Sequence, residues 1–438
     1  MKFKLPKDVE YILETLKKNG HQGYVVGGCV RDLLLGEVPK DWDVATSASV
    51  KEIESTFKKT IDVGVSHGTI IVVINGINYE VTTLKSDSGS LFDSDIKNDL
   101  AKRDLTINAI AYTLDGFLID PFGGEKDLKA KVIRAVLNPK QRFLEDPLRM
   151  LRAIRLSAKL EFVIDDDTFC EIAQNAQKIL NVSVERIRQE LTKILLIDAR
   201  KLEDLYKTNL LKHVLPEFND CFNVSQNHPC HLYDVARHTI LVVEGVEKSE
   251  DLVWAALLHD IGKPLTKTVG KDGFDHFKGH VEKGYEISRE VLKHYRFDNK
   301  LIETVLILIK NHDKKINIDK RSLRNLLSTI GKTNLKKLLK LKVADDGAKS
   351  KGVERFSIEN EKEILNLIGE IEQNEECFSL KQMAIDGDDL KKIGLTEGKM
   401  LGDTLKKLLE MVVKDPSLNT REKLLDIASR ISNKRCQR

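Results

Sequence analysis

The sequence predicts an α+β protein in which a small mixed α/β head is followed by a long all-helical body. Short runs typical of β-strands dominate the first third, among them Tyr24–Val26 and a hairpin over residues 68–84 that turns at Asn75-Gly76. From about residue 140 onward, apolar residues recur every three or four positions, as in Leu148–Leu156 and Val184–Leu195. That spacing is typical of amphipathic helices. Since 438 residues are too many for one core, we expect several units.

The composition is that of an ordinary protein with a charged surface: 41% of residues are hydrophobic, 32% are charged, and the formal net charge is +3. A nucleic-acid partner would therefore need local basic patches. The run Lys332–Lys342 is such a patch, although one solvated helix face also explains it. No apolar run reaches the roughly 20 residues that span a bilayer, and the N-terminus lacks the apolar core of a signal peptide. We therefore expect no membrane partner and a cytoplasmic location.

The first expected strand ends in Gly27-Gly28, and Asp41-Trp42-Asp43 follows shortly. Two glycines between a strand and a helix start allow backbone N–H groups to approach a phosphate. Residues two apart on a strand point to the same face, so Asp41 and Asp43 would present adjacent carboxylates, which repel unless cations lie between them. Mg²⁺ fits this arrangement, with Glu80 as a third oxygen ligand. A solvated acidic turn is the structural alternative.

Further along, the chain offers groups suited to a nucleotide. Arg103 suits a triphosphate because its guanidinium donates two parallel hydrogen bonds, and we expect Asn108 to bond the ribose. Asp146 and Arg149 lie three apart at the start of an expected helix and share a face. A carboxylate plus a guanidinium complements the amino donor and ring-nitrogen acceptor that cytosine and adenine both present.

Uracil and guanine present the reverse pattern, which would leave buried polar groups unpaired at about 1–3 kcal/mol each. The pair Asp146 and Arg149 therefore predicts selection of CTP and ATP over UTP and GTP. Taken without their neighbours, two such residues would simply form a surface ion pair.

Together these segments resemble the class II tRNA nucleotidyltransferases and the related bacterial poly(A) polymerases. The shared pieces are the glycine-glycine-x-valine-arginine-aspartate loop at 27–32, the aspartate pair, the segment 103–108 and Glu145-Asp146-x-x-Arg149, in family order. The resemblance implies that Asp41 and Asp43 hold Mg²⁺, assisted by Glu80, for transfer of CMP and AMP to the 3′ end of tRNA with release of pyrophosphate. It implies these nucleotide-binding residues: Gly27, Gly28, Arg31, Arg103, Asp104, Asn108, Asp146, Arg149, Arg152 and Arg155.

Three departures from the family pattern bear on which nucleotides are added. Lys102 and Lys85 stand where the family commonly has arginine. The connection Ser86–Asn98 is short and free of arginine, whereas enzymes that add all three nucleotides generally carry a longer, arginine-rich loop there. In this respect the chain resembles family members that add only C-C. Both CC and CCA addition therefore stay open. By the same resemblance, Glu185–Glu190 belongs to a helix that supports the base-reading helix, so we expect a structural role for it.

Eight of the eleven histidines lie between His228 and His312. Imidazole and carboxylate together suit Mn²⁺, Ni²⁺, Fe²⁺ or Zn²⁺. The segment His259-Asp260-Ile-Gly-Lys263-Pro, with His238 upstream, resembles the HD metal-dependent phosphohydrolases. The resemblance implies hydrolysis of phosphoesters, with Lys263 near a phosphate; a retained fold with a silent site is the alternative. The implied ligands of an ion such as Mn²⁺ or Ni²⁺ are His238, His259, Asp260 and Asp313, with His280 and His312 as additional candidates.

The two resemblances divide the chain into a catalytic head (1–135), a neck that reads the base (136–205), an HD-type helical body (206–320) and a helical tail that binds tRNA (321–438). Two other functions compete with tRNA nucleotidyl transfer. A poly(A) polymerase shares the head motifs but usually ends in a basic, extended tail. An HD phosphohydrolase with a nucleotide-sensing head would tolerate loss of Asp41 or Asp43, and both are present. A monomer and a homodimer are both compatible with the sequence.

Overall fold

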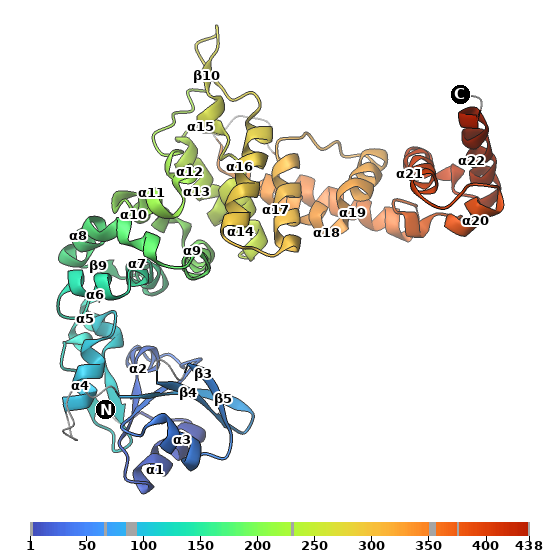
Figure 1. Ribbon diagram of the computed structural model, residues 1–438. Coiled ribbons are helices and arrows are strands. Elements are labelled where there is room, and N and C mark those ends of the chain that lie inside the picture. The colour runs from blue at the N-terminus through green and yellow to red at the C-terminus, as the bar shows by residue number, and fades with distance from the viewer. Residues whose placement is uncertain are drawn as a thin grey trace. The chain divides into compact units, whose positions relative to one another are not determined.

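The computed structural model describes residues 3–64, 68–84, 94–228, 232–349, 356–374 and 376–436 (Figure 1). The chain divides into two compact units, Met1–Pro216 and Glu217–Arg438. The expected head and the expected neck fall in the first unit, and most of the body and all of the tail fall in the second. The finer division into four parts stays a prediction.

The first unit is built on a mixed sheet whose described strands run in the order β3-β4-β5-β2-β1-β6-β7. Only β2 and β5 pair in parallel; the other neighbours are antiparallel. The expected hairpin is present as β4 and β5, with Asn75 and Gly76 at positive φ in its turn. The strands are β1 (Gly23–Val26), β2 (Asp43–Thr46), β3 (Thr60–Gly64), β4 (Thr69–Ile74), β5 (Ile77–Thr83), β6 (Ala111–Thr113) and β7 (Leu118–Ile119).

Short helices cover this sheet (Figure 1). The first of them, α1, buries Val9, Ile12, Leu13 and Leu16, which recur at helical spacing on one face. The helices of this part are α1 (Lys7–Lys18), α2 (Gly28–Leu34), α3 (Val50–Thr56), α4 (Ser94–Ala101) and α5 (Gly124–Ala130). A 3₁₀ turn spans Thr106–Asn108, and β8 (Val132–Ile133) pairs with β9 (Val163–Ile164).

Helices alone make up the rest of the first unit after β8 and β9. Helix α7 buries Leu148, Leu151 and Ile154 on one face. Its other face carries three arginines spaced three apart, which is close to one helical turn. The helices are α6 (Pro139–Glu145), α7 (Leu148–Leu160), α8 (Asp166–Asn175), α9 (Val184–Ile197), α10 (Leu202–Lys207) and α11 (Leu210–Val214), with 3₁₀ turns at Ala176–Asn181 and Ala199–Lys201.

In the described part of the second unit, helices are joined by one small hairpin, β10 (Thr268–Val269) and β11 (Asp275–His276). At its centre, α14 is buried from Leu252 to Leu258. Its helices are α13 (Val235–Gly245), α14 (Glu250–Leu258), α15 (Lys263–Thr266), α16 (His280–His294), α17 (Asn299–Asn311), α18 (Lys320–Gly347), α19 (Ile358–Gln373), α20 (Gly387–Lys392), α21 (Lys399–Lys414) and α22 (Arg421–Cys436). The short α12 (Pro216–Asn219) lies at the start of this unit's chain.

The basic run Lys332–Lys342 lies on α18 and is engaged within the second unit. Lys332 pairs with Glu372 at 2.5 Å, Lys337 pairs with Asp251, and Lys340 pairs with Glu247. The Lys342 ammonium is buried and donates to the His312 carbonyl at 2.6 Å. This run therefore forms ion pairs and packing contacts between helices, whereas the simpler sequence interpretation was a solvated helix face. Among the described residues, no helix is both long and apolar enough to cross a membrane.

Candidate nucleotide and metal sites

A cavity of about 860 Å³ opens in the first unit between the sheet and α7. Its lining brings together residues that are more than a hundred positions apart in the chain. Every residue that the sequence analysis expected to bind nucleotide is in this lining, together with Asp41 and Asp43. We call it the nucleotide cavity; it is lined by Gly27, Gly28, Cys29, Arg31, Asp32, Glu37, Val38, Lys40, Asp41, Asp43, Lys102, Arg103, Asp104, Asn108, Asp146, Arg149, Arg152, Arg155, Leu156, Lys159 and Arg186.

The glycine loop shapes one wall of the nucleotide cavity. Gly27 has a φ of 82°, and a Cβ atom there would lie 2.6 Å from Arg103 Nη1, so only glycine allows the guanidinium this close to the backbone. Arg31 is buried rather than free to reach a ligand. It donates to Asp32 Oδ1 at 2.8 and 2.6 Å and to Asn108 Oδ1 at 2.7 Å. Arg31 and Asn108 therefore hold the loop against the 3₁₀ turn.

The three acidic residues proposed as catalytic lie at the edge where β2 and β5 pair. β2 begins at Asp43, and Asp41 lies in the bend just before it, so the expectation that both lie on a strand holds only for Asp43. Asp43 is the register partner of Glu80 on β5. Burial and the nearby Glu80 and Asp41 carboxylates raise the pKa of Asp43, while Arg103 opposes them. Carboxylates that destabilise one another's charge fit a divalent cation between them.

The arginines of the cavity are held by protein acceptors. Arg103 donates to Asp99 Oδ2 at 3.2 Å. Arg152 donates to Asp104 Oδ2 at 2.7 Å. Burial acts to raise the pKa of Asp104, but Arg152 and a hydrogen bond from Asn108 outweigh it and the pKa is lowered. Asp104 is therefore held as a carboxylate that links the 3₁₀ turn to α7.

Asp146 and Arg149, which the sequence analysis expected to read the base, both line the cavity but do not pair with each other in the structure. Arg149 lies 3.1 Å from Glu145 and donates to the Lys102 carbonyl at 2.7 Å. Asp146 instead accepts from Arg186 of α9 at 2.8 Å. Sequence analysis missed Arg186 as a member of the site, because no spacing rule connects residues 40 positions apart on different helices.

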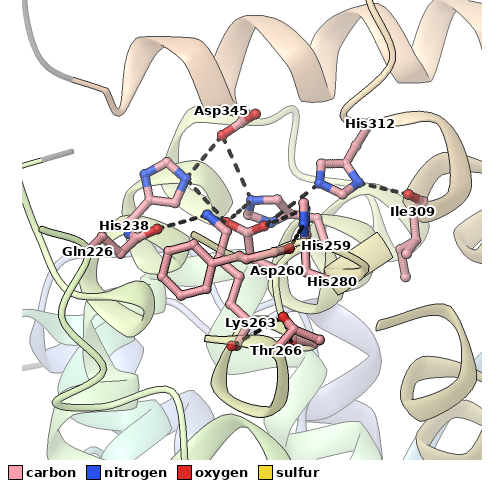
Figure 2. Close-up of polar contacts among 12 residues, drawn as sticks. Gln226, His238, His259, Asp260, Lys263, Thr266, His280, Ile309, His312 and Asp345 are labelled. Atoms are coloured by element: carbon pink, nitrogen blue, oxygen red, sulfur yellow. Dashed lines mark hydrogen bonds and ion pairs between the residues drawn. The ribbon is translucent and has the colours of Figure 1, made fainter. Parts of the chain in front are cut away.

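A group of histidine and aspartate side chains lies together in the second unit. We call it the histidine cluster: His238, His259, Asp260, His280, His312 and Asp345 (Figure 2). These residues come from α13, the end of α14, the start of α16, the end of α17, and α18. The Asp260 carboxylate is central. Its Oδ2 lies 3.1 Å from His259 Nε2 and 3.8 Å from His238 Nε2, and its Oδ1 lies 3.6 Å from His280 Nε2 and 3.7 Å from His312 Nε2.

Backbone carbonyl groups fix the ring orientation of three histidines of the cluster. His259, His280 and His312 each place Nδ1 at 2.7–2.9 Å from the carbonyl three residues earlier. Nδ1 then carries a proton, so that in the neutral ring the lone pair lies on Nε2 and is directed at the cluster. His259 Nε2 is buried and makes no hydrogen bond. A buried nitrogen with a free lone pair beside carboxylates fits a metal ligand.

The carboxylates of the cluster are held ionised although they are buried. Burial acts to raise the pKa of Asp260, but His259 and Lys263 hold it well below its usual range. Burial also acts to raise the pKa of Asp345, but a hydrogen bond from His238 and the charge of Lys349 hold this pKa well below its usual range. Lys263 lies 2.7 Å from Asp260 and donates to Gln226 at 2.8 Å, so its ammonium is already engaged inside the cluster.

One implied ligand is replaced by another. Asp313 does not join the histidine cluster, because its side chain is exposed whereas the cluster is buried. The carboxylate that completes the cluster is Asp345, with Oδ1 at 3.0 Å from His238 Nε2 and 3.8 Å from His259 Nε2. Asp313 directly follows His312 at the end of α17, but its side chain is exposed. The His312 side chain is the one that reaches the cluster.

The segment that bears on CC or CCA addition lies largely outside the described residues. Lys85 and residues 86–93 belong to the part that the structure does not describe, and α4 begins at Ser94. Lys102, the other departure from the family pattern, is described and lines the nucleotide cavity.

Comparison with known proteins places the chain in a family. The chain matches the family models of the poly A polymerase head domain over residues 23–134, of a probable RNA and SrmB-binding site of polymerase A over 161–222, and of the HD domain over 230–347. The CCA-adding enzyme of Ligilactobacillus salivarius is 32% identical over 435 residues, which are 96% of this chain and 95% of the relative. The chain belongs to the CCA-adding enzyme family.

Further relatives of the CCA-adding enzyme family agree. The CCA-adding enzyme of Geobacillus sp. is 44% identical over 226 residues, 49% of this chain and 56% of the relative. A crystal structure of the Bacillus stearothermophilus CCA-adding enzyme in complex with CTP aligns over 99% of this chain and 100% of its own, with 27% identity and a TM-score of 0.75. A Thermotoga maritima CCA-adding enzyme complexed with tRNA shares the fold, with 23% identity, coverage of 97% and 95%, and a TM-score of 0.56. The predicted fold class, a mixed head followed by helices, is confirmed.

Proposed function

We propose that this chain adds nucleotides from CTP and ATP to the 3′ end of tRNA without a nucleic-acid template. The observation that carries the proposal is the nucleotide cavity, which unites the carboxylates Asp41 and Asp43 with the base-reading pair Asp146 and Arg149. Membership of the CCA-adding enzyme family supports the same activity and disfavours the poly(A) polymerase alternative. A cytoplasmic location and the choice between monomer and homodimer stay predictions.

The charge of the cavity suits a triphosphate. Arginine and lysine side chains outnumber carboxylates in its lining. Guanidinium groups bind phosphate oxygens bidentately, and a lining of one dominant sign attracts an anion into the cavity. Mg²⁺ would be held by Asp41, Asp43 and Glu80. When bound, it would activate the tRNA 3′ hydroxyl and neutralise charge on the α-phosphate and on the leaving pyrophosphate. The residues of the chain then position the nucleotide and exclude wrong bases.

The decisive experiment supplies purified protein with Mg²⁺ and three tRNA transcripts, which end before the CCA sequence, after the first C, or after CC. CTP and ATP are given separately and together, and product lengths are read on a sequencing gel. We expect CMP on the first two transcripts. Growth by AMP on the third transcript indicates CCA addition, and its absence indicates CC addition. A long A tail made with ATP alone would support a poly(A) polymerase, and failure to add CMP to any transcript would overturn the proposal.

The histidine cluster favours a second activity, metal-dependent hydrolysis of a phosphoester. Among the described residues, its ligand atoms form two groups within 4.8 Å, His238, His259 and Asp260 on one side and Asp260, His280 and His312 on the other. Because the two groups share Asp260, one oxygen for each, we propose that the cluster holds two ions. Neutral imidazole with carboxylate suits Mn²⁺ or Ni²⁺. A phosphate ester at an RNA end is the proposed substrate, and its removal would restore the hydroxyl that nucleotide addition requires.

The second activity has a test with two readouts. Purified protein is dialysed against Mn²⁺ or Ni²⁺, and bound metal is measured by mass spectrometry beside hydrolysis of an RNA that ends in a 2′,3′-cyclic phosphate. We expect about two ions per chain, and their loss together with hydrolysis in His259→Ala. Asp313→Ala is the matched control and should keep both. Metal loss in Asp313→Ala, or binding of neither metal by the parent protein, would overturn the assignment.

A further inference from the structure

The carboxylate of Asp260 belongs to both ligand groups of the histidine cluster. Each group also contains two histidines, which are His238 and His259 in the first group and His280 and His312 in the second. Asp260 Oδ2 faces the first group, and Oδ1 faces the second. The Lys263 ammonium lies 2.7 Å from Oδ2 (Figure 2). An ammonium therefore already lies beside the oxygen that the first group would offer to an ion.

The contact between Lys263 and Asp260 is buried and held in place by the fold. The two residues are 6% and 3% exposed, so water screens the attraction between their charges only weakly. Lys263 begins α15, and a Cβ atom on Gly262, the residue before it, would lie 2.2 Å from the His280 carbonyl. The backbone beside Lys263 is thus packed tightly against α16. Any rearrangement at this contact must come from the lysine side chain.

The ammonium has two further contacts, which involve no ligand of the cluster. It donates to Gln226 Oε1 at 2.8 Å and lies 5.3 Å from the centroid of the Phe277 ring. The Gln226 amide is buried, and its Nε2 donates to the Tyr233 carbonyl at 3.3 Å, which fixes Oε1 toward the lysine. An amide oxygen and an aromatic face both stabilise a buried cation. The ammonium therefore keeps partners when it gives up Asp260.

An ion at the first ligand group and the Lys263 ammonium need the same oxygen. Both are cations, and two positive charges on one buried carboxylate oxygen repel each other strongly. The second ligand group uses Oδ1, which is not the oxygen that lies 2.7 Å from the ammonium. The two ion positions are therefore unequal, although both are built from two imidazoles and one carboxylate oxygen.

We propose that Lys263 is a built-in counter-ion of the histidine cluster, which competes with one of the two ions for Asp260 Oδ2. Its ammonium neutralises Asp260 until an ion binds at the first ligand group, and then withdraws toward Gln226 and Phe277. This inference rests on the two-ion cluster of the proposed function and assigns the two positions different affinities. The second group would hold a resident ion, and the first group an exchangeable one.

The first test is a calorimetric titration of metal-free protein with Mn²⁺, for the parent and for Lys263→Met. We expect a tighter and a weaker binding event in the parent. Lys263→Met should strengthen the weaker event about tenfold or more and change the tighter one by less than about threefold, because one charge-assisted contact no longer has to be broken. Lys267→Met is the matched control and should titrate as the parent does. Lys267 belongs to the same segment but pairs with Asp275 at 2.9 Å, outside the cluster.

The second test uses Gln226→Leu, which keeps the lysine and should have the opposite effect. Without Gln226 Oε1 the ammonium depends more on Asp260, so the weaker event should lose about threefold or more in affinity. In the double variant Lys263→Met/Gln226→Leu this loss should disappear, because Gln226 acts through the ammonium. Lys263→Met leaves a buried carboxylate without its counter-ion, so the Tm of the metal-free variant should fall and Mn²⁺ should restore it.

Several results would overturn the inference. They are parent-like affinity for both ions in Lys263→Met, an equal gain for both ions, and a Gln226→Leu loss that persists in the double variant. If Lys263→Met does not fold, unchanged affinities in Gln226→Leu overturn the inference alone. A parent that binds one ion and gains a second in Lys263→Met supports it. If the parent binds neither Mn²⁺ nor Ni²⁺, the two-ion cluster itself is wrong, and with it the second proposed activity.

Discussion

Of the acidic residues at the edge where β2 and β5 pair, Asp41 and Glu80 are exposed, and Asp43 is only partly buried. In the histidine cluster, five of the six side chains belong to buried residues, and His280 is half-buried. Among the described residues, three or more metal-ligand atoms lie within 4.8 Å of one another only in the histidine cluster. The ligand atoms of the cluster are thus all supplied by the protein, whereas the acidic residues beside β2 and β5 would, on the proposed function, provide only part of a coordination shell and leave the rest to substrate phosphates.

This difference follows from what each region must exchange. On the proposed function, a nucleotide enters and pyrophosphate leaves at every turnover, so the site would hold its cations by a few carboxylates and leave coordination positions open for phosphate oxygens. The cluster has the opposite design. Its histidine rings are fixed by backbone carbonyls, and its carboxylates are held ionised by neighbouring imidazole and ammonium groups. Ligands that are held in place in advance bind an ion without reorganising themselves.

The largest expected effect separates the two regions. Asp43→Asn should lower the rate of CMP addition by about 10³-fold, since a carboxylate that holds the metal is lost. Metal bound at the histidine cluster should not change. Because burial and neighbouring carboxylates raise the pKa of Asp43 in the folded state, its ionised form costs stability at neutral pH, and the variant should keep or slightly raise Tm. Single-turnover assays measure the rate of CMP addition, metal analysis measures the ions bound at the cluster, and calorimetry measures Tm. CMP addition within tenfold of the parent rate would contradict the metal role.

An intermediate effect concerns the backbone behind the cluster. A Cβ atom on Gly262 would lie 2.2 Å from the His280 carbonyl and 2.6 Å from the Gly284 nitrogen, so Gly262→Ala must push the start of α16 away. We expect a loss of about 1–3 kcal/mol in the free energy of unfolding and weaker metal binding, with CMP addition retained. Gly369→Ala is the control, because no atom lies within 4 Å of its Cβ position. Unchanged metal affinity in Gly262→Ala would show that His280 is not a ligand.

The smallest expected effect tests whether the basic run of α18 is structural. Lys332→Gln removes a pair with Glu372 in which both side chains are more than a third exposed. Such pairs contribute about 0.5 kcal/mol or less, so Tm should barely change. Since this lysine serves packing, the salt dependence of tRNA binding should also stay the same. Filter-binding titrations at several salt concentrations measure this dependence. If the slope of log K against log salt concentration became smaller by about one in the variant, Lys332 would instead be assigned to a phosphate contact.

Local patterns predicted much of the fold and of the nucleotide cavity. The hairpin turn at Asn75-Gly76 and the apolar face of α7 follow from backbone preference and helical spacing, and both are found in the structure. The cavity residues were identified because their motifs occur in order along one stretch of chain. Asp41 was placed wrongly on a strand, since β2 starts two residues later.

Local sequence patterns could not predict the contacts between helices that are far apart in the sequence. Nothing in the sequence around Asp345 marks it, because its role arises only when α18 packs beside α13 and brings it to His238. Asp313 is the ligand that the resemblance to HD phosphohydrolases implies, because that family has an aspartate well downstream of the His-Asp pair, yet the side chain of Asp313 is exposed. Arg186 was missed for a similar reason, since its partner lies on another helix.

Helix α18 contains one residue in a non-helical conformation, Gly331, with φ 77° and ψ 160°. On its N-terminal side, Arg324 donates to the Val413 carbonyl at 2.9 Å and pairs with Glu376. On its C-terminal side lie Lys342 and Asp345, which reach the histidine cluster. The helix thus consists of two helical segments that meet at Gly331. The N-terminal segment bonds to the last helices of the chain, and the C-terminal segment bonds to the histidine cluster. Because the helical backbone is interrupted at Gly331, the two segments are not one continuous helix and can point in different directions.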